Sequence, residues 1–396
     1  MAPKSAGTSS SELRLLRNGE QAFARILERI GAARTSVRMR CFDWHDDQAG
    51  RLFGRALLAA AERGVQVTIE KDRVGANYEY LDGSQQSFLH KQMDLLATLQ
   101  TMFLMVAYDR IGSLKQHPNP LAEALVSHPN VHVVGDERRF DHSKVFVIDG
   151  EVLIVGGMGI SDEFHRSNVD FMVEMDDRDL VDRFLELEAG RARFDPCRDI
   201  DFLVRPAWLR DCPVLDARLR LIASARERLT IEMAYFGEPH CTDALVAAVK
   251  RGVEVSILTS RRANIIGDLN LGTCDLILRR TKAPANLRVV LHPRMVHGKA
   301  VVADGKVVQI GSANFTRISH ATYAEVDLFA RPEARAAAVE QAIFAAMAAG
   351  EPQAARIPFR LPYFYVERAI LQYQARARKN VRVQEPWGDA ALGDAE

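Results

Sequence analysis

The 396-residue sequence is poor in several features that would indicate a function directly. Its 52 Lys and Arg residues balance 52 Asp and Glu residues, so the formal net charge is zero. No overall electrostatic attraction to nucleic acid or to anionic lipid is therefore indicated. The five cysteines form no C-x-x-C pair, which favours a reducing compartment and argues against a zinc site.

Long apolar runs are absent as well. The N-terminal stretch MAPKSAGTSSSELRLL has no apolar core of signal-peptide length, so residues 1–12 are expected to form a short disordered lead. The longest uncharged apolar run, residues 95–108, is too short to span a bilayer. The sequence therefore predicts a soluble or peripheral protein, long enough for two domains or two fused halves.

What the sequence does contain is one motif written twice. The segment FDHSKVFVIDGEVLIVGGMGISDEF begins at residue 140, and RMVHGKAVVADGKVVQIGSANFTRIS begins at residue 294. Their histidines are 297 − 142 = 155 residues apart, and four further positions keep this offset. The matched pairs are His142 and His297, Lys144 and Lys299, Asp149 and Asp304, Gly156 and Gly311, and Asp170 and Glu325. Such agreement in one register indicates an internal duplication.

The duplication also sets the expected fold. In each copy the residues before the motif read helix, strand, helix, strand, and the motif itself reads as a hairpin of two strands. We expect an α/β protein of two fused halves related by a pseudo-twofold axis, each a mixed sheet flanked by helices, with the active site at their interface. The expected boundaries are 13–200 for the first half, with an insertion at about 74–130, 201–347 for the second half, and 348–396 for a basic, aromatic tail.

The paired His and Lys residues point to phosphodiester chemistry. Residues i and i+2 of a strand share a face, so His142 with Lys144, and His297 with Lys299, are expected to project together into one cleft. Two ammonium groups can hold the phosphate oxygens. One histidine can attack phosphorus while the other protonates the leaving oxygen.

Further positions are expected to support this pair. Asp170 and Glu325 are candidates for orienting the histidines, and Ser312 and Asn314 for donating hydrogen bonds to the phosphate. Asp149 and Asp304 each precede a glycine, as in hairpin turns, so a structural role is expected for them first. The remaining histidines, at positions such as 45, 117 and 292, have no comparable context and are left unassigned.

The pattern H-x-K-x4-D-x6-G-S-x-N resembles the signature of the phospholipase D superfamily. The second copy matches it throughout, whereas the first has Gly157 and Gly159 where Ser and Asn would stand. The segments LLRNGEQAFARILERIGAA, ALLAAAERGVQVTI and VIDGEVLIVGGMGISDEF are most similar to bacterial cardiolipin synthases, whose first turn is typically Gly-Gly-x-Asn. The segment HRSNVDFMVEM lacks the Trp-Arg-Asp-Thr sequence common in that subfamily.

The resemblance implies transfer of a phosphatidyl group to an alcohol or to water through a phosphohistidine, without metal or cofactor. By the same resemblance, His142 is the nucleophile and His297 the acid. The alternative is a metal-independent nuclease-type phosphodiesterase of the same superfamily, and a non-catalytic scaffold is a third class. No nucleic acid is expected as partner, because the chain is neutral and its basic cluster lies near the C-terminus.

The substrate implied by the resemblance is a phospholipid, so we expect a cytoplasmic protein that docks on an anionic membrane surface, peripheral on the inner membrane. Residues 356–382 carry seven basic residues and one Glu among apolar and aromatic side chains, a composition that suits a lipid headgroup boundary. Packing of this tail on the catalytic core is the alternative, and the oligomeric state is left open. The apolar residues of the tail are Phe359, Tyr363, Phe364, Tyr365, Ile370 and Leu371. For the insertion, which contains Phe103, Leu104 and Met105, a lid or a second lipid contact is expected, with core packing as the alternative.

Overall fold

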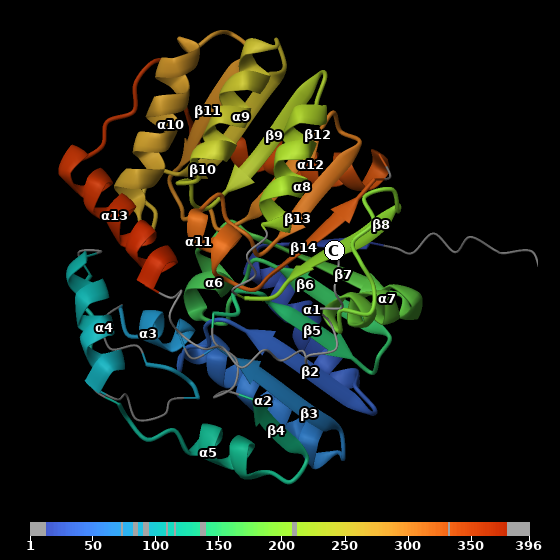
Figure 1. Cartoon of the computed structure of the whole chain (residues 1–396). Helices are drawn as coiled ribbons and strands as arrows, with labels where there is room; N and C mark the ends of the chain where they lie inside the picture. Colours follow the sequence, from blue (N-terminus) through green and yellow to red (C-terminus); the bar gives the residue numbers. More distant parts are fainter. Residues whose placement is uncertain are drawn as a thin grey trace, which may run out of the picture.

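The computed structural model describes residues 13–72, 74–81, 86–89, 95–107, 110–114, 116–134, 140–207, 212–331 and 333–377. The predicted lead and the end of the predicted tail lie outside these residues. The described chain forms two mixed sheets, one from each half, stacked on one another (Figure 1). The predicted fold class, two similar α/β halves, is confirmed.

The first sheet has seven strands within the described residues, in the order β1-β7-β6-β5-β2-β3-β4. β2 with β3 and β3 with β4 are parallel, and every other neighbouring pair is antiparallel. The strands are β1 (Leu13–Arg17), β2 (Ser36–Cys41), β3 (Gln66–Lys71), β4 (Val131–Val134), β5 (Val145–Ile148), β6 (Val152–Gly156) and β7 (Phe171–Asp176). The helices are α1 (Asn18–Ala32), α2 (Gln48–Glu62), α3 (Gly75–Glu79), α4 (Leu95–Ala107), α5 (Pro120–Ser127), α6 (Asp162–Arg166) and α7 (Arg178–Glu188).

The second sheet has eight strands in the part of the chain that is described, in the order β15-β11-β10-β9-β12-β13-β14-β8. Only the pairs that β10 makes with β9 and β11 are parallel there. The strands are β8 (Ile200–Arg205), β9 (Arg228–Met233), β10 (Glu254–Ser260), β11 (Leu287–His292), β12 (Lys299–Ala303), β13 (Val307–Gly311), β14 (Glu325–Ala330) and β15 (Glu351–Gln353). The helices are α8 (Pro213–Ser224), α9 (Pro239–Lys250), α10 (Gly267–Thr281), α11 (Arg317–Ala321), α12 (Glu333–Met347) and α13 (Leu361–Ala377).

The two sheets repeat one register. In the first, Val37 of β2 lies opposite Ile148 of β5, and in the second Leu229 of β9 lies opposite Ala303 of β12. Ile148 and Ala303 are 155 residues apart in the chain, which is the offset of the sequence motif. Equivalent strands therefore carry the two copies of the motif to equivalent places.

Burial on both faces explains the composition of the central strands. β5 (VFVI) and β6 (VLIVG) are buried at every position, as expected for strands covered on both sides. On one face α1 packs its buried residues, Phe23, Ile26 and Ile30 among them, which recur at helical spacing. The opposite face of the sheet is turned toward the other half.

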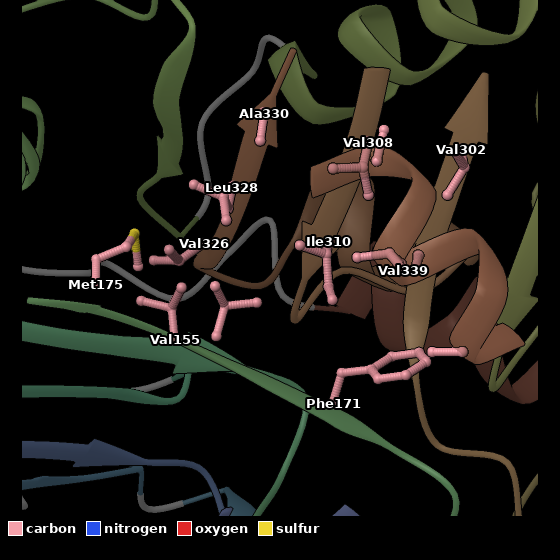
Figure 2. Packing of buried hydrophobic residues seen from close by; sticks show 14 of the residues in the cluster. Val155, Phe171, Met175, Val302, Val308, Ile310, Val326, Leu328, Ala330 and Val339 are labelled. Atoms are coloured by element: carbon pink, nitrogen blue, oxygen red, sulfur yellow. The ribbon is translucent and has the colours of Figure 1, made fainter. Parts of the chain in front are cut away.

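A hydrophobic cluster built from both halves joins them (Figure 2). Val155 of β6 and Phe171 of β7 belong to the same buried cluster as Ile310 of β13, Val326 of β14 and Val339 of α12. Burying such branched side chains contributes about 1.5–3 kcal/mol each. The shared core fixes the two halves relative to one another, as a site between them requires.

The segment predicted as a tail begins as part of the second half. β15 pairs with β11, and α13 packs on α10. The Arg360 guanidinium pairs with Asp268, and the backbone N–H of Leu269 donates to the Glu367 carboxylate at 2.6 Å. Among the described residues no helix combines the length and apolarity needed to cross a membrane.

Candidate active site

The sequence pattern places both His-x-Lys pairs in strands, and for three of these four residues that prediction is wrong. β5 begins only at Val145, and β12 begins at Lys299 itself. The segments before these strands bond to the other half instead. The N–H of His142 donates to the carbonyl of Ala324 at 2.9 Å, and that of His297 to Val169 at 2.7 Å. The backbone contacts between the halves therefore place the two histidines.

Each histidine is held by a carboxylate of the other half. Nδ1 of His142 lies 3.2 Å from Oε2 of Glu325, and Nδ1 of His297 lies 2.8 Å from Oδ2 of Asp170. Both carboxylates are buried. The sequence identified these acids as orienting residues, but the spacing along the chain gave no sign that they act crosswise. The arrangement holds Nδ1 of each ring at a carboxylate and leaves Nε2 of His142 for a ligand.

The two lysines are buried beside the histidines. Nζ of Lys144 donates to the carbonyl oxygen of His142 at 2.6 Å. Nζ of Lys299 lies 2.8 Å from Nδ1 and 3.1 Å from Nε2 of His297. The expectation that each Lys accompanies its own His therefore holds in space.

Burial dominates the electrostatics of this cluster. It lowers the pKa of both histidines, with help from the neighbouring lysine charges, to about 4 for His297. Burial also lowers the pKa of Lys144, and that of Lys299 to about 7. Burial alone would raise the pKa of Glu325, but His142 and the Ser312 hydroxyl lower it to about 2. Near neutral pH the site thus holds neutral imidazoles and ionised Glu325.

A cavity of about 120 Å³ lies over the histidines, between the halves. A single water needs roughly 10–15 Å³ on this measure, so a headgroup-sized ligand has room. His142, Lys144, His297 and Asn314 line the cavity, whereas Lys299, Asp170, Glu325 and Ser312 are buried outside its lining. The other lining residues include Phe42, Asp43, His45, Tyr78, Leu81, Arg110, Glu163, Phe164, Tyr235, Asn264, Thr316, Ser319, Tyr323, Leu371 and Gln374.

Ser312 and Asn314 were both expected to contact phosphate, but only Asn314 lines the cavity. The Ser312 hydroxyl donates to Oε2 of Glu325 at 2.5 Å, so it supports the carboxylate. Asn314 lines the cavity, and its Oδ1 is buried without a hydrogen-bond partner among the described residues. Gly156 and Gly311 lie where a Cβ would come within 2.4 Å of a neighbouring strand or side chain, so only glycine fits.

Asp149 and Asp304 occupy equivalent turns outside the cavity. The Asp149 carboxylate accepts hydrogen bonds from the N–H groups of residues 34–36, and that of Asp304 from residues 226–228. Both have a φ of 54°, in the left-handed region that Asp tolerates in turns. These contacts fit the structural role expected of an Asp-Gly hairpin.

The two glycines that depart from the superfamily pattern lie against acidic side chains. A Cβ on Gly157 would lie 2.5 Å from Oδ1 of Asp170, and one on Gly159 would lie 2.2 Å from Oδ1 of Asp43. Either substitution would force a carboxylate to move. The carboxylates of Asp170 and Asp43 thus occupy the space that Ser and Asn side chains would fill in the first turn.

Sequence reasoning missed the rings around the histidines. The ring of Tyr323 stacks on His142 at 5.4 Å between centroids, and Phe42 meets the same imidazole edge-on at 4.9 Å. Phe164 contacts His297 in the same edge-on way at 4.9 Å. His45, left unassigned by the sequence, also lines the cavity. The aromatic residue after β2 was a visible signal, whereas Tyr323 had none.

No group of three or more His, Cys, Asp or Glu residues within the described ranges could hold a metal ion.

Two stacked halves with paired His-x-Lys motifs at their interface define an enzyme of the phospholipase D superfamily. The model of the family described as "Cardiolipin synthase, PLD-like domain" matches residues 26–187 and 219–347. The chain belongs to this family, which confirms the resemblance seen in the sequence.

Curated relatives and a solved structure agree with this assignment. The chain is 26% identical over 358 residues to cardiolipin synthase A of Pseudomonas entomophila (strain L48), covering 84% of this chain and 68% of the relative. It is 26% identical over 360 residues to cardiolipin synthase A of Pseudomonas fluorescens (strain SBW25), covering 84% and 67%. Phosphatidylserine synthase of Haemophilus influenzae Rd KW20 matches the fold with a TM-score of 0.66 at 14% identity, covering 94% of this chain and 95% of that one.

Proposed function

We propose that the protein transfers a phosphatidyl group from a phospholipid to an alcohol or to water, through a phosphohistidine. The observation that carries this proposal is the pair of imidazoles at one cavity, each fixed at Nδ1 by a carboxylate of the opposite half. A fixed neutral imidazole is a competent nucleophile, and a second one can move the proton that the leaving group needs.

In the first step Nε2 of His142 attacks phosphorus, a phosphorus–nitrogen bond forms, and the bond to the headgroup oxygen breaks. His297 gives its proton to that oxygen. Binding of the anionic phosphodiester raises the pKa of His297 from its low value in the empty site, so the ring can carry this proton. In the second step neutral His297 takes a proton from the incoming hydroxyl, which displaces His142 from phosphorus.

The remaining groups stabilise charge. Lys144 and Asn314 both line the cavity, so the ammonium and the amide can each contact a non-bridging oxygen. Ionised Glu325 stabilises the imidazolium that forms on His142 during attack. The assignment of nucleophile and acid follows the family resemblance.

The direct test supplies purified protein with labelled phosphatidylglycerol and follows the release of glycerol and the new phosphatidyl product. Supercoiled plasmid serves as the parallel substrate for nuclease activity. We expect lipid turnover that survives EDTA, because the buried lysines supply the positive charge. Plasmid nicking without lipid turnover would replace this proposal by the nuclease alternative. Loss on chelation, restored by a divalent ion, would contradict the metal-free mechanism.

We also propose that the face beside the cavity docks on a membrane surface. Buried residues of α4 and α13 share one hydrophobic cluster with Phe42 and Tyr235 of the cavity wall, and the two helices lie on the same side of the molecule (Figure 1). Their outer faces expose Leu99, Met102, Phe103 and Val106 on α4, and Leu361, Tyr363, Tyr365, Val366 and Tyr373 on α13. Exposed apolar and aromatic groups on a face beside the cavity suit a lipid headgroup boundary.

The set of docking residues differs from the one expected from sequence. Ile370, Leu371 and Leu104 are buried, because α13 and α4 pack on the core through them. Of the tail's cations, Arg356 pairs with Asp275 and Arg360 with Asp268. One face of α13 packs on the core, and the other is exposed and available for the proposed docking.

A further inference from the structure

One wall of the cavity carries an acid that the proposed reaction does not use. Asp43 follows β2, is 9% exposed and lines the cavity. Its equivalent in the second half is Tyr235, because the next residues, Trp44 and Phe236, bridge to positions 160 and 315, which are 155 apart. The pseudo-twofold symmetry is thus broken by a carboxylate on one side and a phenol on the other.

Asp43 also takes the space of a side chain that the other half has. A Cβ on Gly159 would lie 2.2 and 2.4 Å from its two carboxylate oxygens, and the equivalent of Gly159 is Asn314, which faces the cavity. In the first half, an amide that could donate a hydrogen bond to phosphate is therefore replaced by a carboxylate, which is negatively charged and can only accept hydrogen bonds. Against an anionic phosphodiester alone this exchange is unfavourable.

The carboxylate has few partners of its own. No described residue donates a hydrogen bond to it, and its ion-pair neighbour within the described ranges is Nε2 of His45, at 3.8 Å. The nearby ammonium of Lys144 donates to the His142 carbonyl. The charge of Asp43 interacts favourably with the ammonium groups of Lys144 and Lys299. Since no described residue donates a hydrogen bond to it, its acceptor positions remain available to a cation that enters with the ligand.

We propose that Asp43 binds the ammonium group of an amino-alcohol headgroup, so that the preferred substrate is a zwitterionic phospholipid of the phosphatidylethanolamine type. This proposal rests on the proposed phosphatidyl transfer and deepens it. The rings of Phe42, Tyr78 and Tyr235 line the same cavity, and aromatic faces attract ammonium groups. The phosphate then meets Lys144 and the ammonium meets Asp43, so both charges of a zwitterion are matched. A glycerol headgroup leaves Asp43 unpaired.

The test compares headgroup release from mixed micelles of phosphatidylethanolamine and phosphatidylglycerol. The wild-type protein should prefer the ethanolamine lipid in kcat/KM. Asp43→Asn should lower the ratio of the two kcat/KM values by about 10- to 100-fold, the usual worth of a hydrogen bond to a charged group, and spare the glycerol lipid. The control is Asp182→Asn, the same loss of charge at an exposed position of α7, which should leave the ratio unchanged.

A second variant reverses the exchange. Asp43→Ala with Gly159→Asn restores an amide at the first turn and should favour the glycerol lipid. Added ethanolamine and glycerol, used as acceptors, show whether the amine enters with the donor or as the incoming alcohol. A loss that is equal for both lipids in Asp43→Asn would overturn the ammonium site.

Wild-type turnover of phosphatidylglycerol with none of phosphatidylethanolamine, as donor or as acceptor product, would overturn the ammonium site and leave phosphatidyl transfer standing. If neither lipid is turned over, the transfer proposal fails. Calorimetric binding of phosphoethanolamine against glycerol phosphate then still decides on Asp43. Equal affinities for the two, unchanged in Asp43→Asn, would sink the ammonium site.

Discussion

In the first half the turn after the hairpin carries Gly157 and Gly159, and in the second half the equivalent positions carry Ser312 and Asn314. The serine donates to the longer acid, Glu325, whereas the glycine leaves space against the shorter acid of the first half, Asp170. The two halves thus reach similar carboxylate–histidine contacts by different pairs of residues. The carboxylate–histidine contact is of the same kind in both halves, but a glycine accompanies the shorter acid in one half and a serine accompanies the longer acid in the other.

Two equivalent buried positions, one in the central strand β2 and one in β9, carry side chains of opposite charge type. Arg40 of β2 and Glu232 of β9 are equivalent, since their partners Val145 and Ala300 are 155 apart. Arg40 pairs with Glu70 and Glu188. Neither carboxylate oxygen of Glu232 has a hydrogen-bond partner in the described structure, and burial followed by the charge of Asp170 raises its pKa well above the ordinary range. The second half therefore holds an acid whose neutral form burial favours, where the first holds a paired cation.

The largest expected effect tests whether the two histidines have different roles despite their similar settings. His142→Asn and His297→Asn should each lower kcat by at least about 10³-fold, because nucleophile and acid act as one unit. His297→Asn should accumulate a covalent phosphatidyl adduct, and His142→Asn should form none. Alkaline quenching followed by intact-protein mass spectrometry reads this difference.

Thermal unfolding of both variants provides the control, since each must retain the wild-type transition. An adduct that forms on His142→Asn and not on His297→Asn would exchange the roles of the halves. Near-normal turnover in either variant would rule out the two-histidine mechanism.

A smaller effect is expected from the crossed carboxylates. Asp170→Asn and Glu325→Gln should each lower kcat/KM by about 10- to 100-fold, as loss of an orienting partner usually does. In ¹⁵N-histidine NMR spectra, Asp170→Asn should shift the Nδ1 resonance of His297 and leave His142 in place, and Glu325→Gln should do the reverse. A shift confined to the histidine of the same half would contradict the crossed arrangement.

The pH dependence separates the two lysines. Burial lowers the pKa of Lys299 to about 7, so its ammonium is present below that pH and is lost as the pH rises through it. The kcat/KM, which reports the free enzyme, should therefore fall on the alkaline side near pH 7. Lys299→Arg keeps its charge and should move this limb upward, whatever its absolute rate. If Lys144→Arg moved the alkaline limb of the kcat/KM profile and Lys299→Arg did not, the limb would belong to Lys144 of the first half.

The smallest effect concerns the exposed faces of the two halves. Replacing Tyr365 and Tyr373 of α13 by Ser should weaken binding to anionic vesicles by roughly tenfold, from the apolar area lost. Phe344→Ser on α12, also an exposed aromatic, is the control and should bind as wild type. Co-sedimentation measures both. Equal binding of all three proteins would show that α13 is not the anchor.

Much of this fold follows from one sequence, because a duplication states the same pattern twice. The 155-residue offset located both motifs, and alternating helices and β-branched strands indicated the two sheets. The crossed pairing of Asp170 and Glu325 could not be predicted, since it depends on backbone bonds between the halves, such as that from His142 to Ala324. The role of Asp43 could not be predicted for a related reason, because its carboxylate lies against Gly159, which is far from it in the sequence.

The crossed carboxylates have a consequence for biosynthesis. During translation the chain carries His142 and Lys144 long before residue 325 has been added. Until then His142 lacks the acid that fixes its ring, and its counterpart His297 does not exist. Under the proposed mechanism, a nascent chain that has the first motif alone lacks both the second imidazole and the acid that fixes the first. Activity would then begin only when both halves have closed on one another, so assembly itself would protect the membrane from a partly made enzyme.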